Sequence, residues 1–334
     1  MSAPISDISG EHKVYLRFLG KARHFLFNLR SFNLTPAEPI PAAATKAVEV
    51  SVALGCAVNG TAQPSDIAAA VKMASQADVA LVFVGVDQAI GAEGHDRSHI
   101  GLPGVQSDLI KAVLAANPRT VLVISSNAPV AINWEQENVP AIVGGIFAGQ
   151  EQGHAIADVL FGDYNPAGKI TTTWYASVDD LPHFHDYDVR KGRTYMYYQG
   201  KPLYPFGHGL SYTTFEYANL EVTASALKPQ KAVGIALSIT NTGRIAGDEI
   251  VQFYVHVNGS KVQRPIKQLV DFARVHLEPG ETKTVSFALG HDDQALKYWD
   301  EAQQDFVQEP GKIDILVGAS SADIRLKGAV NLMV

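Results

Sequence analysis

Residues 79–116 contain an apolar run, Val79-Ala-Leu-Val-Phe-Val84, a long loop from Gly85 to Gly104, and then Gln106-Ser-Asp-Leu-Ile-Lys-Ala-Val-Leu-Ala-Ala116. The apolar run predicts a buried strand, and the amphipathic segment after the loop predicts a helix. A strand, a loop and a helix in this order are typical of a parallel α/β sheet, which displays functional residues at the carboxyl ends of its strands. This stretch therefore predicts a fold and the place of a site within it.

The same alternation continues on both sides of this stretch. The remaining patterns predict strands over 48–54, 120–125 and 141–147, a short connecting element over 130–134, and helices over 66–76 and 150–161. Ser65 is the expected N-cap of the first of these helices. Strands that alternate with helices at these lengths indicate an α/β sandwich, with a parallel sheet covered on both faces.

The character of the chain changes after Tyr212, where short segments alternate or run apolar at strand length. Five such segments cover residues 215–223, 233–241, 249–257, 283–289 and 313–318. Turn signals such as Asn241-Thr-Gly and Pro279-Gly separate them. About seven short strands in such a stretch are typical of a β-sandwich. The expected fold class is therefore α/β followed by all-β.

Composition excludes several classes of function. A chain of 334 residues is long enough for two domains, and its net charge of -7 with no basic stripe argues against a nucleic-acid partner. A neutral ligand such as a sugar fits this charge. No apolar run approaches the length of a membrane span, and no secretory segment is visible. The single cysteine, Cys56, allows no internal disulfide and is expected to be buried, so the compartment stays open.

Three charged residues lie close together in the central loop: Glu93, Asp96 and Arg97. One acid here can serve as a proton donor, while a neighbouring carboxylate and guanidinium can bind hydroxyl groups and influence its ionisation. The alternative is a solvated surface loop in which Asp96 and Arg97 merely cap the next helix. The chemistry of the residues alone leaves both interpretations open.

A resemblance to a known family bears on that choice. Ala92-Glu-Gly-His-Asp-Arg97, followed by Leu102-Pro-Gly-Val-Gln106, resembles the acid/base loop of family 3 glycoside hydrolases. Asn165-Pro-Ala-Gly-Lys-Ile-Thr-Thr-Thr-Trp174 and Tyr204-Pro-Phe-Gly-His-Gly-Leu-Ser-Tyr-Thr213 resemble two further segments of the same family, in the same order. The similarity runs from residue 46 to residue 334.

The resemblance implies a domain order and roles for the loop. It implies an α/β-sandwich domain over 46–205, a fibronectin type III-like domain over 206–334, and an atypical or truncated segment over 1–45. No counterpart of the family's usual first strand is visible there, which leaves open whether that strand is present. Glu93 matches the acid/base position of retaining β-glucosidases and β-xylosidases, which protonates the glycosidic oxygen and later deprotonates water. Asp96 and Arg97 are expected to shape the loop through an ion pair rather than to bind the sugar.

The resemblance also implies a missing part. In this family the nucleophile is an Asp on an N-terminal TIM barrel, and no matching segment occurs here. We therefore expect a β-linked glucoside or xyloside as the substrate of the complete system, with a separate TIM-barrel chain as a partner, and little hydrolysis by this chain alone. The alternative function is a non-catalytic carbohydrate-binding or scaffold module of the same origin. The sequence does not distinguish glucose from xylose.

Other candidate residues have weaker signals. His183 and His185 lie among two Asp residues, but a polar loop is a better interpretation than a metal site. Trp134, Trp174 and Trp299 can stack on sugars, although isolated tryptophans are more often core residues. The glycine-rich segment 144–153 lacks the Gly-Lys-Ser/Thr of a phosphate loop. Neither a metal nor a cofactor is expected.

Overall fold

The computed structural model describes residues 13–15 and 49–334, which divide into two compact units. Unit 1 extends to Tyr164 and includes Tyr175–Val178, and unit 2 contains Asn165–Trp174 and Asp179–Val334. Asn165–Trp174 thus packs with the C-terminal part of the chain. The domain boundary expected between residues 205 and 206 stays a prediction.

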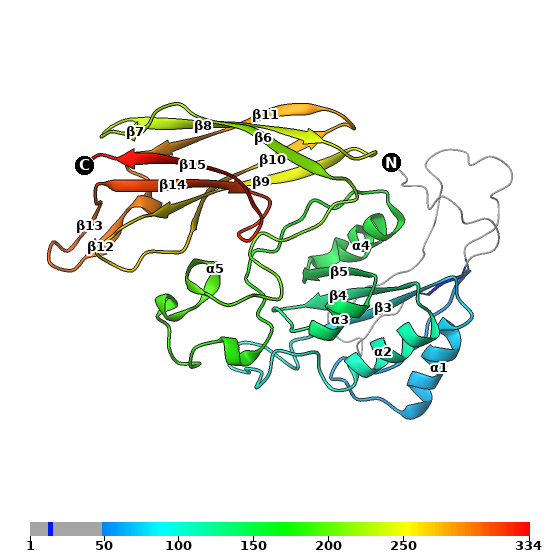
Figure 1. The fold of residues 1–334 in the computed structure, drawn as a ribbon. Coiled ribbons are helices and arrows are strands. Elements are labelled where there is room, and N and C mark those ends of the chain that lie inside the picture. The colour runs from blue at the N-terminus through cyan, green and yellow to red at the C-terminus, as the bar shows by residue number, and fades with distance from the viewer. Residues whose placement is uncertain (1–12, 16–48) are drawn as a thin grey trace. The chain divides into compact units, whose positions relative to one another are not determined.

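Unit 1 is built on a five-stranded parallel sheet with the strand order β2-β1-β3-β4-β5. Its strands are β1 (Lys13–Tyr15), β2 (Glu49–Val50), β3 (Val79–Val86), β4 (Thr120–Ser126) and β5 (Ala141–Ile146). Its helices are α1 (Pro64–Ala74), α2 (Gln106–Ala116), α3 (Asn133–Asn138) and α4 (Gln152–Phe161), with the 3-10 turn η1 (Gly149–Glu151) before α4. Figure 1 shows α1 and α2 side by side.

The core of unit 1 forms where β3 and β4 meet α2. The apolar run of β3 is buried almost throughout, as is Leu122 in the middle of β4. Leu109, Ile110 and Val113 of α2 are buried, and they share one face because Val113 follows the other two by four and three positions. This packing confirms the parallel α/β region that the apolar runs predicted.

Three details of unit 1 differ from the expectation. The segment expected as a strand over 48–54 forms a strand only at Glu49–Val50. The first strand is not missing: Val14 in β1 pairs in parallel with both Val50 and Val79. Three residues are too few to produce a visible period, so the sequence did not reveal this strand. The N-cap of α1 is Gln63 rather than Ser65, and the Asp66 carboxylate accepts a hydrogen bond from the Gln63 N–H at 3.3 Å.

Unit 2 is an antiparallel β-sandwich apart from one short parallel pair between β15 and β7 (Figure 1). One sheet has the order β10-β9-β14-β15-β7, a second has the order β11-β8-β6, and β12 and β13 form a hairpin. The strands are β6 (Phe215–Val222), β7 (Ala226–Leu227), β8 (Ala232–Asn241), β9 (Gly247–Val257), β10 (Gln268–Leu277), β11 (Thr282–Gly290), β12 (Tyr298–Asp300), β13 (Asp305–Val307), β14 (Gly311–Gly318) and β15 (Ile324–Leu332).

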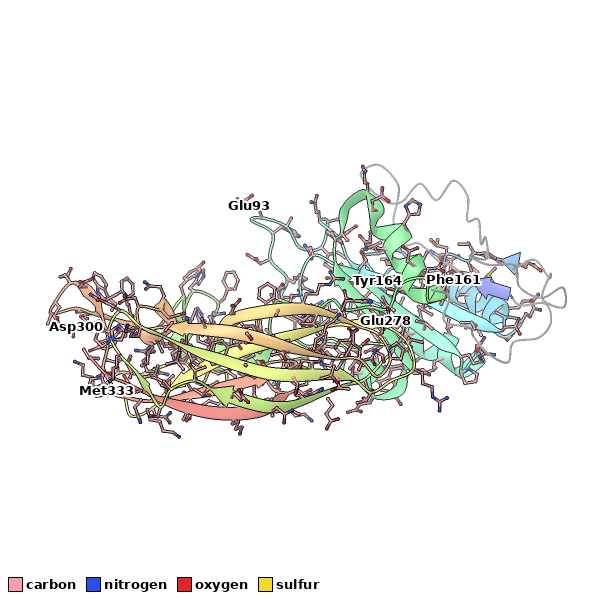
Figure 2. The ribbon with its side chains drawn as sticks, turned by 90° about the horizontal axis from the view of Figure 1, so that it is seen from above. Glu93, Phe161, Tyr164, Glu278, Asp300 and Met333 are labelled. Atoms are coloured by element: carbon pink, nitrogen blue, oxygen red, sulfur yellow. The ribbon has the colours of Figure 1, made fainter. Side chains whose placement is uncertain are left out.

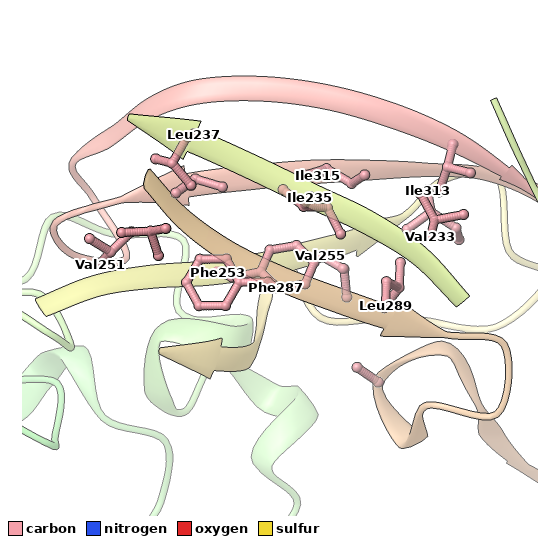
Figure 3. Close-up of a cluster of buried hydrophobic side chains, with 14 of the residues drawn as sticks. Val233, Ile235, Leu237, Val251, Phe253, Val255, Phe287, Leu289, Ile313 and Ile315 are labelled. Atoms are coloured by element: carbon pink, nitrogen blue, oxygen red, sulfur yellow. The ribbon is translucent and has the colours of Figure 1, made fainter. Parts of the chain in front are cut away.

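The two sheets of unit 2 enclose one apolar core, shown in Figure 3. Alternate residues of β8 point inward, and its buried side chains face those of β9 and β14 across the sandwich. Phe253 of β9 stacks on Phe287 of β11 with ring centroids 5.5 Å apart. The period of two that predicted these strands is therefore the pattern that fills the core.

The segment before the sandwich has little regular structure. It contains the short elements η2 (Val178–Asp180), η3 (Val189–Lys191) and α5 (Thr194–Tyr197), and a further 3-10 turn, η4 (Gln294–Leu296), lies before β12. Among the described residues, no helix has the length and apolar character needed to cross a membrane.

Candidate active site

The loop after β3 begins at the carboxyl edge of the parallel sheet. β3 ends at Val86 and α2 begins at Gln106, so residues 87–105 connect them. Gly85 pairs with Ser125 of β4, and Ser125 pairs with Gly145 of β5, so three strands end at the same level. This edge is where open α/β sheets place their functional groups.

Glu93 lies at the tip of this loop in a tight turn. The N–H of Ala92 donates to the carbonyl of His95 at 3.0 Å, and the N–H of His95 donates to the carbonyl of Ala92 at 2.9 Å. Gly94 has φ +71°, the left-handed conformation that a type II turn requires at its third residue. Figure 2 shows Glu93 at the end of the loop, and its side chain is exposed.

Arg97 ties the loop to the segment after β4. Its Nη2 donates to the carbonyl of Pro129 at 3.0 Å, while its Nη1 is buried without a hydrogen-bond partner. Partial burial lowers the pKa of this guanidinium because the charged form loses water. The expected ion pair with Asp96 is absent from this part of the described chain, where Asp96 is exposed. Arg97 therefore contacts the main chain at Pro129, and the ion-pair expectation was wrong.

Asn127 adds a second tie that the sequence analysis missed. Its Nδ2 donates to the carbonyl of Gly91, next to the turn that carries Glu93. Further along the loop, the N–H of Ala131 donates to the carbonyl of Ile100 at 2.7 Å. A polar residue directly after a buried strand was the available signal for Asn127. These contacts hold the loop on both sides of Glu93.

The Glu93 carboxylate itself is open to water. It forms neither a hydrogen bond nor an ion pair within residues 13–15 and 49–334. A retaining glycosidase requires a second carboxyl group about 5–5.5 Å from the acid/base. No contact in the described chain gives Glu93 such a partner. Unit 1 thus presents Glu93 as an exposed carboxylate at the tip of an anchored loop.

The glycine-rich segment after β5 is fixed to the neighbouring strand end. The buried Gln152 donates through Nε2 to Oγ of Ser125 at 2.8 Å, and its Oε1 accepts from the N–H of Ala148 at 3.1 Å. Glu151 and His154 are exposed and lie 2.7 Å apart, a contact that raises the pKa of His154. The two hydrogen bonds of the Gln152 amide thus fix the segment after β5 to Ser125 at the end of β4.

The histidine pair of the later loop shows no arrangement for metal binding. His183 and His185 lie in a loop rather than a strand, with ring centroids 5.6 Å apart. The nearby acids are engaged elsewhere, Asp186 with Lys191 and Asp188 with Arg190. In the described part of the chain, no group of three or more His, Cys, Asp or Glu residues is placed to hold a metal ion.

The three tryptophan side chains differ in how exposed they are. Trp174 is buried against Tyr204, with ring centroids 5.7 Å apart, and Trp134 lies half-buried beneath Lys111. Trp299 is 47% exposed and meets Phe306, which is 55% exposed, across the β12–β13 hairpin. Their rings meet edge to face with centroids 5.3 Å apart. Trp299 alone of the three presents an open aromatic surface.

Comparison with known proteins gives matches to both units. The profile of the Glycosyl hydrolase family 3 C-terminal domain matches residues 9–212, and that of the Fibronectin type III-like domain matches residues 249–321. Thermostable beta-glucosidase B of Acetivibrio thermocellus is 38% identical over 273 residues, which cover 78% of this chain and 36% of that protein. Periplasmic beta-glucosidase of Salmonella typhimurium is 38% identical over 276 residues, covering 79% of this chain and 35% of that protein.

Solved structures agree with these sequence matches. The β-glucosidase of Kluyveromyces marxianus, in complex with glucose, superposes with a TM-score of 0.72 at 37% identity over 82% of this chain and 34% of that one. The family 3 β-glucosidase of Bifidobacterium adolescentis gives a TM-score of 0.77 at 33% identity, over 85% of this chain and 44% of that one. The chain therefore spans about a third of the length of the relatives it matches by sequence. It belongs to family 3 of the glycoside hydrolases, of which it carries the C-terminal α/β domain and a fibronectin type III-like domain.

Proposed function

We propose that this chain acts in the hydrolysis of β-linked glucosides or xylosides by supplying the acid/base loop of a retaining exo-glycosidase. Glu93 donates a proton to the glycosidic oxygen as the bond to the leaving group breaks. It then takes a proton from the water that attacks the glycosyl intermediate. The observation that carries this proposal is the tight turn that presents Glu93 alone at the tip of an anchored loop.

We infer that a TIM-barrel domain outside residues 1–334 supplies the nucleophile of this reaction. The exposure of Glu93 supports this inference, because an acid/base catalyst works in a site from which most water is excluded. Asp96 is also exposed, so it is free to contact the sugar or the barrel. Arg97 keeps a loop-shaping role through Pro129.

The test is hydrolysis of aryl β-glucoside and aryl β-xyloside by the purified chain, alone and mixed with the barrel domain of a family relative. We expect hydrolysis only in the mixture, and a loss of about 10²-fold or more in Glu93→Gln, because general acid–base catalysis contributes that much. Asp96→Asn is the matched control for removal of one loop charge and is expected to cost less. Equal rates for the unchanged chain and Glu93→Gln would contradict the role of Glu93.

A second candidate function rests on Trp299. An exposed Trp–Phe pair on a hairpin is suited to contact with the apolar face of a sugar ring, as in a non-catalytic carbohydrate-binding module. If no mixture hydrolyses either substrate while the chain binds β-linked oligosaccharide and Trp299→Ala abolishes that binding, the module is the correct function.

A further inference from the structure

Gln106 is a fully buried polar residue at the first position of α2, directly after the loop that carries Glu93. Its Oε1 accepts a hydrogen bond from the N–H of Gly85 at 2.9 Å. Its Nε2 donates to the carbonyl of Gly85 at 2.9 Å and to the carbonyl of Val58 at 2.6 Å. One side-chain amide thus forms hydrogen bonds with the N–H and the carbonyl of Gly85 and with the carbonyl of Val58, which lies before α1.

These partners determine the orientation of the amide. Only an oxygen can accept from the N–H of Gly85, and only an NH₂ group can donate to two carbonyls. Both Nε2 protons have acceptors, so every buried polar atom at this point is paired. Loss of the amide would leave two buried carbonyls and one buried N–H without these partners, at about 1–3 kcal/mol each.

The chain crosses itself at the same place through glycines. The N–H of Val105 donates to the carbonyl of Gly60 at 3.0 Å. A Cβ on Gly60 would lie 2.3 Å from the carbonyl oxygen of Pro103, and a Cβ on Gly104 would lie 2.5 Å from the carbonyl oxygen of Gly60. Because both contacts involve main-chain atoms, side chains at these positions would separate the two segments. The crossing is therefore close enough to fix where the loop ends.

We propose that Gln106 is a positioning residue. It holds together the two ends of the 87–105 loop at Gly85 and Gln106, here called the neck of the loop, and thereby fixes the position of Glu93. Gly85 precedes the loop and Gln106 follows it, so this amide joins the two ends of the segment that carries the acid. Asn127 at Gly91 and Arg97 at Pro129 then hold the two sides of an already closed loop. Gln106 touches neither substrate nor Glu93 and acts through the main chain. The inference rests on the function proposed for Glu93.

Holding the two ends of the loop together costs conformational entropy, which the hydrogen bonds of Gln106 offset. Bringing the ends of a flexible loop together loses entropy that grows with the logarithm of its length. Without the amide, the loop ends regain that freedom, and Glu93 samples positions away from the glycosidic oxygen. Displacement of a catalytic group by about 1 Å can reduce a rate by about 10²-fold. Gln106 should therefore affect the catalytic rate more than the binding of sugar.

Amide hydrogen exchange of the intact chain tests the closure without requiring catalysis. The amides of Ala92, His95 and Val105 are hydrogen-bonded within the loop or at its neck. In Gln106→Leu we expect them to exchange at least about 10-fold faster, since the buried polar groups lose their partners. Ile124 in β4 reports on unit 1 as a whole and should keep its exchange rate. Unchanged exchange at Ala92 and His95 in a folded variant would overturn the proposal.

Gln152→Leu is the matched control. Gln152 is also a buried glutamine at the start of a helix and also fixes a strand end, but its partners are Ser125 and Ala148. Its replacement should leave exchange at Ala92 and His95 unchanged. If both variants accelerate those amides equally, the effect is a general loosening of unit 1, and Gln106 has no special role.

Gln106→Glu gives a second readout if the leucine variant does not fold. When protonated, the introduced carboxyl group can donate to the carbonyl of Gly85. When ionised, it opposes two carbonyl oxygens at once. Loop protection, corrected for intrinsic exchange, should therefore fall as the pH rises through the pKa of the introduced group. Protection that is independent of pH would contradict the assigned hydrogen bonds.

The catalytic consequence is measured in the active mixture with the barrel domain. Gln106→Leu is expected to lower kcat by roughly 10- to 100-fold and to change KM by less than about 2-fold. A rise in KM with an unchanged kcat would show that Gln106 supports sugar binding and would overturn the positioning role. If the unchanged chain shows no hydrolysis in any mixture, the proposed function fails, whereas the exchange data still decide whether Gln106 closes the neck.

Discussion

Asp188 and Arg190 form a bidentate ion pair in the loop before α5. Arg190 Nε donates to Oδ1 of Asp188 at 2.8 Å and Nη2 donates to Oδ2 at 2.9 Å. The hydrogen bonds from the Arg190 side chain and main chain hold the pKa of Asp188 at about 2, below its ordinary 3.8. A lowered carboxyl pKa stabilises the folded state above the unfolded pKa, and this contribution is lost as the pH falls through about 2.

Replacement of Arg190 by Gln should therefore raise the pKa of Asp188 toward its ordinary value. An NMR titration of the Asp188 carboxyl carbon measures the midpoint in both proteins. Lys191→Gln is the control, because Lys191 bonds to Asp186 at 2.6 Å and should move the pKa of Asp186 more than that of Asp188. An ordinary midpoint for Asp188 in the unchanged chain would show that the ion pair is not maintained in solution.

Single residues also show where sequence reasoning ends. Glu93 was predicted from its motif, and the structure adds the turn that presents it. The partner of Arg97 was not predictable, because the Pro129 carbonyl lies 32 positions along the chain and belongs to the main chain. Gln106 was visible only as the last letter of Leu-Pro-Gly-Val-Gln. Its role depends on contacts with Val58 and Gly85 that no local pattern contains.

At the scale of elements, β3 and β4 approach each other closely at Gly85. An added Cβ there would lie 1.6 Å from the carbonyl oxygen of Ser125, which is main chain and cannot rotate away. Gly85→Ala should lower the free energy of unfolding of unit 1 by about 1–3 kcal/mol or more, as overpacking does. Gly145→Ala in β5 is the control, since nothing lies within 4 Å of its added Cβ. Equal midpoints of chemical denaturation for the two variants would contradict the close approach.

Most elements with a strong period were predictable from sequence, although the alternating segment 48–54 forms a strand only at Glu49–Val50. The helix over Gln106–Ala116 agrees with its prediction, and β3 and β4 extend only slightly beyond theirs. β10 and β15 were not assigned individually among the strands of the sandwich. Most β10 side chains are partly or fully exposed, and a register shift between Leu269 and Asp271 breaks its alternation. β15 does alternate, with Arg325 and Lys327 between apolar residues, and this signal was overlooked. β1 is too short for any period.

At the scale of the whole chain, Asn165–Trp174 lies in the same compact unit as the β-sandwich. Nζ of Lys169 lies 3.3 Å from Oε1 of Glu249, and both side chains are largely buried, 12% and 5% exposed. Nζ also donates to the carbonyl of Gly209 at 2.7 Å. Asn165 donates to the carbonyl of Ala246 at 2.9 Å, so side chains join the segment to the sandwich.

A fragment of residues 206–334 should consequently be much less stable than a fragment of residues 165–334. It would lose Lys169 and the side-chain bond of Asn165 to the sandwich, and breaking a buried ion pair by removal of one partner costs about 3–5 kcal/mol. Urea denaturation measures the difference in the free energy of unfolding between the two fragments. Lys169→Met in the longer fragment removes only the charge of Lys169 and keeps residues 165–205. We expect Lys169→Met to destabilise the longer fragment by a large part of the difference between the two fragments. Equal stability of the two fragments would place the boundary of the folding unit near residue 206 and make Lys169 dispensable to the sandwich.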